Sequence, residues 1–274
     1  MSISALQEYT RHARYARYLP ELRRRETWIE QVNRVFEMHY DFLGSEICAS
    51  LKGELEFTKR MVLQKRVLGS QRALQFGGDP VLKKNARLYN CTVSYCDRPR
   101  FFQEAMWLLL CGCGVGFSVQ YDHVNKLPNI LSVNDEDTIV YTIPDTIEGW
   151  ADAIGVVISS YIVGDTIPFP EFQNRRVIFD YSLIRPEGSP LSSGSKAPGP
   201  DKLHESLDNI AHLLDVASKH QTRLRPIDAY DIVMYSSEAV LSGCVRRSAT
   251  ICIFSPEDDE MVNAKTGSWQ HTHK

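Results

Sequence analysis

The stretch LYNCTVSYCDRPRFFQEAMWLLLCGCGVGFSV, residues 88–119, combines thiols with a run of glycines. It holds four of the seven cysteines in the chain, which are Cys91, Cys96, Cys111 and Cys113. Gly112, Gly114 and Gly116 form a G-x-G-x-G pattern at its end. Such a stretch could be a nucleotide-binding loop, a metal site or a redox site.

The glycines follow a helix in this pattern. Residues 100–110 predict a buried helix, because apolar side chains cover most of its circumference. The glycines end that helix and lead into the β-like segment FSV, residues 117–119. A dinucleotide-binding loop has the reverse order, since it follows a strand and opens a helix. The pattern therefore disfavours a Rossmann-type loop.

The cysteines do not have the spacing of a zinc site. Zinc is commonly held by two C-x-x-C or C-x-x-H pairs, whereas Cys111 and Cys113 have no second pair. His271 and His273 are expected to lie in a frayed end, so the sequence predicts no metal. Most thiols are expected to be small buried apolar groups, namely Cys48, Cys96, Cys111, Cys113 and Cys252.

Length and composition indicate a globular protein. The 274 residues are 43% hydrophobic and 24% charged, enough for one large domain or two small ones. No apolar run approaches the roughly 18 residues that cross a bilayer, and no secretory signal opens the chain. An odd number of cysteines in a chain of this size is typical of reduced thiols, so we expect a cytoplasmic protein.

The charge pattern argues against nucleic acid and membranes as partners. The net charge is −3, and the arginines near the N-terminus alternate with glutamates. Such a mixture is typical of a solvated helical face. We therefore expect no general nucleic-acid binder, and the lack of a long apolar run excludes a membrane-spanning protein.

The N-terminal region is predicted to be helical from about residue 5 to 66. Trp28, Val32, Val35 and Phe36 fall on one stripe at three- and four-residue spacing. Pro20 is expected to separate the first helix from the second. These patterns predict a helical region at 1–66, followed by a larger domain at 67–274.

The rest of the chain alternates helices and short strands. Residues 122–180 contain strand-like pieces and one helix with Ile147, Trp150, Ile154 and Ile158 on one face. The Gly-, Pro- and Ser-rich segment 185–202 is expected to be an ordered loop or a flexible crossing. Further predicted elements are helices at 203–218 and 226–241, a strand buried on both faces at 249–254, and a helix capped by Ser255 with Pro256 at its first position. The order indicates an α/β architecture.

Several short motifs resemble one enzyme family. They are RALQFGG (72–78), NARLYNC (85–91), LLLCGCGVGFSV (108–119), FDYSLIRPEGSPL (179–191), APGP (197–200) and SGCVRRSATICIF (242–254). In this order they resemble the N-terminal half of a ribonucleotide reductase. The resemblance is strongest to the class II, adenosylcobalamin-dependent enzymes of the monomeric ribonucleoside-triphosphate type.

The resemblance implies a fold and a redox role. The family fold is a ten-stranded α/β barrel behind a helical region, and this chain would form its first half. Cys91 would be one of the two thiols that reduce the ribose and end as a disulfide. Asn90 and the backbone at Gly114 would bind the ribonucleotide substrate.

The resemblance also implies regulation by a dNTP effector. Arg246 and Arg247 lie in the loop that would report the effector to the substrate base, although Cys244 replaces a glycine that is usual there. Residues of about 122–180 resemble an insertion that builds the effector pocket in monomeric members. Asp122 and Lys126 are the candidate contacts there.

The family's remaining parts would come from elsewhere. The chain ends before the radical cysteine, the second redox thiol, most adenosylcobalamin contacts and the thiols that react with a thioredoxin-type reductant. We therefore expect a fragment, or one product of a split gene that needs a second chain carrying the C-terminal half. Three functions stay open: part of a reductase, a nucleotide-binding module without catalysis, or a remnant that cannot fold alone.

Overall fold

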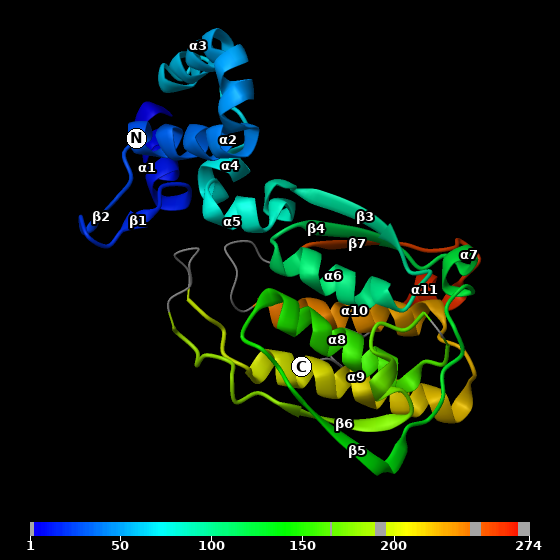
Figure 1. Ribbon diagram of the computed structural model, residues 1–274. Coiled ribbons are helices and arrows are strands. Elements are labelled where there is room, and N and C mark those ends of the chain that lie inside the picture. Colours follow the sequence, from blue (N-terminus) through cyan, green and yellow to red (C-terminus); the bar gives the residue numbers. More distant parts are fainter. Residues whose placement is uncertain (1–2, 165, 190–195, 242–247, 268–274) are drawn as a thin grey trace. The chain divides into compact units, whose positions relative to one another are not determined.

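The computed structural model describes residues 3–164, 166–189, 196–241 and 248–267. The chain divides into two compact units, and the division falls between Asn90 and Cys91. Figure 1 shows the elements of both units. Within the described ranges, no helix has the length and apolar character needed to cross a bilayer. The predicted boundary at residue 66 is not tested by this division and stays a prediction.

The first unit is mainly helical. Its larger elements are α1 (Ile3–Arg14), α2 (Trp28–Ser50), α3 (Lys52–Leu63), α4 (Gln71–Phe76) and α5 (Asp79–Lys83). Helix α2 begins with a capping box, in which Thr27 and Glu30 satisfy each other's backbone N–H groups. The predicted stripe is confirmed at Val32, Val35 and Phe36, which are all buried.

The segment between the first two long helices differs from the prediction. Helix α1 ends at Arg14, well before Pro20, and a two-stranded antiparallel hairpin follows. Its strands are β1 (Tyr18–Leu19) and β2 (Arg24–Arg25). Pro20 therefore lies in a β-turn region, where its fixed φ and missing N–H are tolerated.

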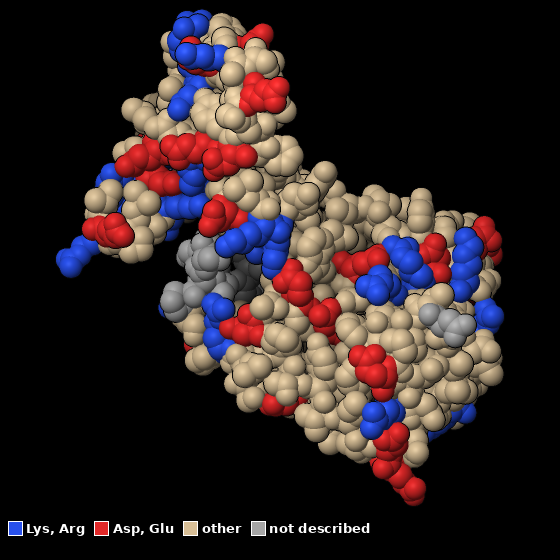
Figure 2. Space-filling view, viewed as in Figure 1, with Lys and Arg blue, Asp and Glu red and all other residues tan. Residues whose placement is uncertain are grey.

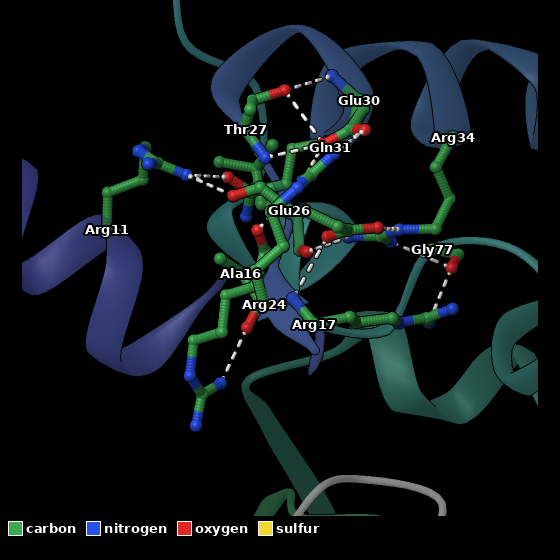
Figure 3. Close-up of polar contacts among 12 residues, drawn as sticks. Arg11, Ala16, Arg17, Arg24, Glu26, Thr27, Glu30, Gln31, Arg34 and Gly77 are labelled. Atoms are coloured by element: carbon green, nitrogen blue, oxygen red, sulfur yellow. Dashed lines mark hydrogen bonds and ion pairs between the residues drawn. The ribbon is translucent and has the colours of Figure 1, made fainter. Parts of the chain in front are cut away.

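A buried carboxylate joins the elements of the first unit. Glu26 is 4% exposed and binds the guanidinium of Arg34 through both carboxylate oxygens, at 2.6 and 2.8 Å. It also accepts from the backbone N–H of Arg17. Arg34 and Arg17 each donate to the carbonyl of Gly77, as Figure 3 shows. The network therefore ties the hairpin, α2 and the end of α4 together.

The second unit contains a three-stranded parallel sheet in the order β3-β4-β7. The strands are β3 (Cys91–Tyr95), β4 (Gly114–Ser118) and β7 (Thr250–Ile253). Helix α6 (Arg100–Leu110) connects β3 to β4, with the bounds that the sequence predicts. Gly112 has a φ of +84° in the turn after α6, a conformation that glycine adopts without strain. The predicted order of helix, glycine turn and strand is confirmed.

Helices cover one face of this sheet (Figure 1). Helices α6 and α10 (Pro226–Leu241) lie next to the strands, and α8 (Ile147–Tyr161) and α9 (Asp201–His220) form a further layer. The main core cluster includes Val115 and Phe117 of β4 and Leu109 of α6, each 1–2% exposed. The predicted helices at 203–218 and 226–241 and the helix with Ile147, Trp150, Ile154 and Ile158 are confirmed.

Two predictions near the C-terminus are wrong. Strand β7 is not buried on both faces, because Ile251 is 69% exposed and Ile253 is 53% exposed. The last helix, α11 (Asp259–Asn263), begins three residues later than expected and has Asp258 as its cap. Ser255 instead accepts a hydrogen bond from the backbone N–H of Tyr121.

The region 122–180 forms two parallel strands around α8. They are β5 (Asn134–Thr142) and β6 (Arg175–Asp180), and the short helix α7 (Tyr121–Val124) precedes them. An ion pair ties this region to α9: Arg176 binds both oxygens of Asp215 at 3.0 and 3.2 Å, and the hydroxyl of Tyr161 donates to Asp215 at 2.7 Å. The predicted mixture of strands and one helix is confirmed.

We expect this ion pair to make the free energy of unfolding depend on pH. Burial raises the pKa of Asp215, but hydrogen bonds from Arg176 and Tyr161 outweigh it, so its pKa lies below the ordinary value of 3.8. A carboxyl with a lowered folded-state pKa stabilises the fold above the unfolded pKa, and this contribution is lost as pH falls through the folded pKa. Urea titrations at pH 5 and pH 3 should show that acidification lowers the free energy of unfolding less in D215N than in the wild type.

The control D208N alters an exposed carboxyl, so acidification should lower its free energy of unfolding as much as in the wild type. An equal decrease in D215N and the wild type would contradict the prediction.

Candidate functional site

Cys91 is the first residue of β3 and has an exposed side chain. It pairs in register with Gly114 of β4, so the backbones of these two predicted site residues are neighbours across the sheet. The hydroxyl of Thr92 donates to the carbonyl of Gly114 at 3.2 Å and reinforces this pairing. The structure therefore brings the predicted redox thiol and the predicted backbone contact together.

The same face of the sheet carries apolar side chains without a cover. Because paired residues of neighbouring parallel strands point to one side, Cys91 and Val93 share a face with Gly114, Gly116 and Ile251. Val93 is 75% exposed there. Parallel sheets are normally buried on both faces. The uncovered face is therefore unusual for the fold.

Gly116 lies on this face between two larger side chains. A Cβ atom at this position would lie 3.4 Å from the Cγ2 of Ile251 and 3.5 Å from the Cγ2 of Val93. Gly114 likewise has no side chain beside Cys91. Gly114 therefore leaves bare backbone next to the thiol, which a ligand can approach closely, whereas Gly116 is buried between the two larger side chains.

The other described cysteines are less accessible than Cys91. Cys96, Cys111 and Cys113 are buried, as the sequence analysis predicts, whereas Cys48 and Cys252 are only half-buried. Burial raises the pKa of Cys96 well above its ordinary value, and it raises the pKa of Cys252 to about 12. Because the thiolate is the reactive form, burial lowers the reactivity of these two thiols. Cys91 is the exposed thiol of the described chain.

Asn90 is the last residue of the first unit, and Arg72 holds its side chain through a hydrogen bond. The Nε of Arg72 donates to Oδ1 of Asn90 at 3.0 Å, and Nη2 of Arg72 donates to the carbonyl of Tyr89 at 3.2 Å. Arg72 is only 2% exposed, and its guanidinium lies 5.3 Å from the ring centre of Phe76. Arg72 was not predicted to be a site residue. The available signal was an arginine in the same short helix as the apolar residues Leu74 and Phe76.

The predicted effector residues are only partly described. Arg246 and Arg247 lie outside the described residues. Asp122 belongs to α7 and Lys126 follows that helix, and both are exposed. No ion pair joins these two side chains in the described part of the chain. The structure gives them access to solvent without assembling them into a site.

The described residues do not assemble a metal centre. No group of three or more His, Cys, Asp or Glu side chains lies close enough there to hold a metal ion. Figure 2 shows acidic and basic side chains interspersed on the face drawn.

Comparisons with known proteins point to one family. A family model described as B12-dependent ribonucleotide reductase, insertion domain, matches residues 118–214. The adenosylcobalamin-dependent ribonucleoside-triphosphate reductase of Lactobacillus helveticus is 28% identical over 313 residues, covering 92% of this chain and 41% of that protein. The enzyme of the same name from Lactobacillus leichmannii is 26% identical over 309 residues, with the same coverage.

A solved structure has the same fold. The crystal structure of a B12-dependent (class II) ribonucleotide reductase matches with a TM-score of 0.80 at 24% identity, and the match covers 97% of this chain and 44% of that chain. The chain thus spans about two fifths of the length of the curated relatives it matches. The expected α/β fold with part of a barrel and the resemblance to the N-terminal part of these enzymes are both confirmed.

Proposed function

We propose that this chain, which resembles the N-terminal part of the adenosylcobalamin-dependent ribonucleotide reductases, supplies the reducing thiol and part of the substrate site of such an enzyme. One observation carries the proposal: the exposed Cys91 lies beside the bare backbone of Gly114 on an uncovered sheet face. Asn90, which precedes Cys91 in the chain, would bind the substrate with Gly114.

The reaction needs two electrons from a pair of thiols. Cys91 and a second cysteine would each lose a hydrogen atom and form a disulfide, while the ribose C2′–OH becomes C2′–H and the oxygen leaves as water. Such an exchange requires the partner thiol to be poised beside the first. A thioredoxin-type reductant would then restore both thiols. Because reduced thiols persist in the cytoplasm, we propose that location as well.

The partner would be a polypeptide with the C-terminal half of the enzyme. The uncovered face with Val93 and Ile251 supports this, because a covering layer would bury both side chains. Strands β3 and β7 also lie at the ends of the sheet order, where the described chain offers them no further strand. Open strand edges are the surfaces on which additional strands pair. The second half would thus add strands and cover the face.

The cofactor would be held mainly by that second half. Adenosylcobalamin supplies the radical that starts the reaction when it is bound. We propose that most of its contacts come from the C-terminal part of these enzymes, which lies beyond the two fifths of their length that this chain spans.

A dNTP effector would bind to the insertion. The match of the insertion-domain model to residues 118–214 supports the presence of this insertion. Asp122 and Lys126 are proposed contacts because they are exposed on this segment. Arg246 and Arg247 would relay effector binding to the substrate. The proposed extent of the insertion at about 122–180 lies inside the matched range.

Reconstitution tests the function. We expect the chain to form a complex with a polypeptide that carries the missing half, and this complex should convert a ribonucleoside triphosphate to its deoxy form only when adenosylcobalamin and a dithiol are present. Sedimentation first establishes the complex, and chromatography of the nucleosides measures turnover. A folded complex without turnover would count against the enzyme. Binding of dATP, dGTP or dTTP by the isolated chain in calorimetry, without turnover in the complex, would favour a nucleotide-binding module.

A further inference from the structure

The contact between Arg72 and Asn90 determines which atom Asn90 can offer to a ligand. A guanidinium has only N–H donors, so the side-chain atom of Asn90 that lies 3.0 Å from Nε must be its oxygen. The usual ambiguity between the oxygen and nitrogen of an amide is therefore removed here. With its oxygen engaged, Asn90 keeps its NH₂ group for other partners.

The guanidinium is itself held in place. Arg72 is 2% exposed, donates to the carbonyl of Tyr89 and faces the ring of Phe76, which is also buried. Arg87 approaches the same ring, at 5.6 Å from its centre. A planar cation that is packed against a ring and bonded to two oxygens has little freedom to rotate. The orientation of the Asn90 amide is therefore fixed before any ligand arrives.

We infer that Arg72 is a positioning residue that makes Asn90 a hydrogen-bond donor, and that the group recognised by Asn90 is an oxygen acceptor of the substrate, either a phosphate or a ribose oxygen. Asn90 is exposed, and no described residue accepts from its NH₂ group. This inference rests on the proposed function for the identity of the ligand. The orientation of the amide does not depend on it.

The variant N90D separates the donor role from a structural role. A carboxylate at this position still accepts from Arg72, and charge strengthens that bond, so the fold should be as stable as the wild type. The variant has no NH₂ group, however, and its charge repels a phosphate. Calorimetry of the reconstituted protein with CTP or ATP should show affinity at least about tenfold weaker than for the wild type. Wild-type affinity in N90D would overturn the inference.

A double-mutant cycle tests whether Arg72 acts through Asn90. R72M should weaken nucleotide binding in the wild-type background but have little further effect in N90A, because the group that Arg72 orients is then missing. R72K, which keeps one cationic donor, should restore part of the affinity and provides a second variant if R72M folds poorly. R87M removes the other cation near Phe76 and should bind nucleotide like the wild type. Additive effects of R72M and N90A would contradict the positioning role.

An NMR measurement keeps the inference testable without nucleotide binding. The side-chain NH₂ resonances of Asn90, identified by their loss in N90D, should shift or broaden in R72M and remain in place in R87M. Unchanged resonances in R72M would overturn the inference. If the resonances respond as expected but the wild type binds no nucleotide, the proposed function fails while the positioning of Asn90 stands.

Discussion

We expect the substitution C91S to abolish ribonucleotide reduction by the reconstituted enzyme. A serine hydroxyl is close to the cysteine thiol in size, but it cannot form a disulfide and so cannot supply one of the two electrons. Cys91 is exposed at the start of β3, so the substitution should leave the fold intact. Turnover should fall to the background of the assay, and deoxynucleotide formation measured over many turnovers checks this.

The matched control is C48S. Cys48 is half-buried in α2, and its thiol makes a long contact of 3.7 Å with the carbonyl of Tyr40 that a hydroxyl can also make. We expect full turnover from this variant. Full turnover in C91S would contradict the proposal that Cys91 is a reducing thiol. An equal decrease of turnover in both variants would show that the loss of any thiol disturbs the protein.

The substitution E26A should strongly destabilise the first unit. Glu26 is 4% exposed and neutralises the largely buried guanidinium of Arg34. Removing one partner of a buried ion pair leaves an uncompensated charge, which costs about 3–5 kcal/mol. Chemical denaturation followed by circular dichroism should show this decrease in the free energy of unfolding. The transition of the first unit should move to lower denaturant concentration.

The exposed pair Lys52–Glu56 gives a control on the same unit. Both side chains are more than 60% exposed and lie 4.0 Å apart, so E56A should change stability by less than about 0.5 kcal/mol. If E26A lowers the free energy of unfolding no more than E56A does, the network around Glu26 contributes little to stability. The double variant E26A/R34M should recover part of the lost stability, because it removes the unpaired cation.

Much of the second unit follows from local pattern. Helix α6 has the predicted bounds because its apolar side chains cover most of the circumference and Gly112 ends it. The turn at Gly112 also orients β4 parallel to β3, which brings Gly114 beside Cys91. The site pairing is thus encoded within some 25 residues, and a sequence motif could indicate it.

Other features depend on distant partners and could not be predicted. The hairpin around Pro20 is stabilised by Glu26, whose buried partner Arg34 comes from a later helix. The hydroxyl of Ser255 accepts from the backbone N–H of Tyr121, 134 residues away in sequence, and Asp258 caps α11. Strand β7 looks fully buried in sequence because its residues are apolar on both faces, yet only one face is covered. Local periodicity contains no information on such contacts.

The uncovered face of the sheet has a consequence for the solubility of this polypeptide. An apolar β surface with two open edges tends to associate with any similar surface, including that of another copy. This surface would therefore favour aggregation of the chain until the proposed covering polypeptide pairs with it.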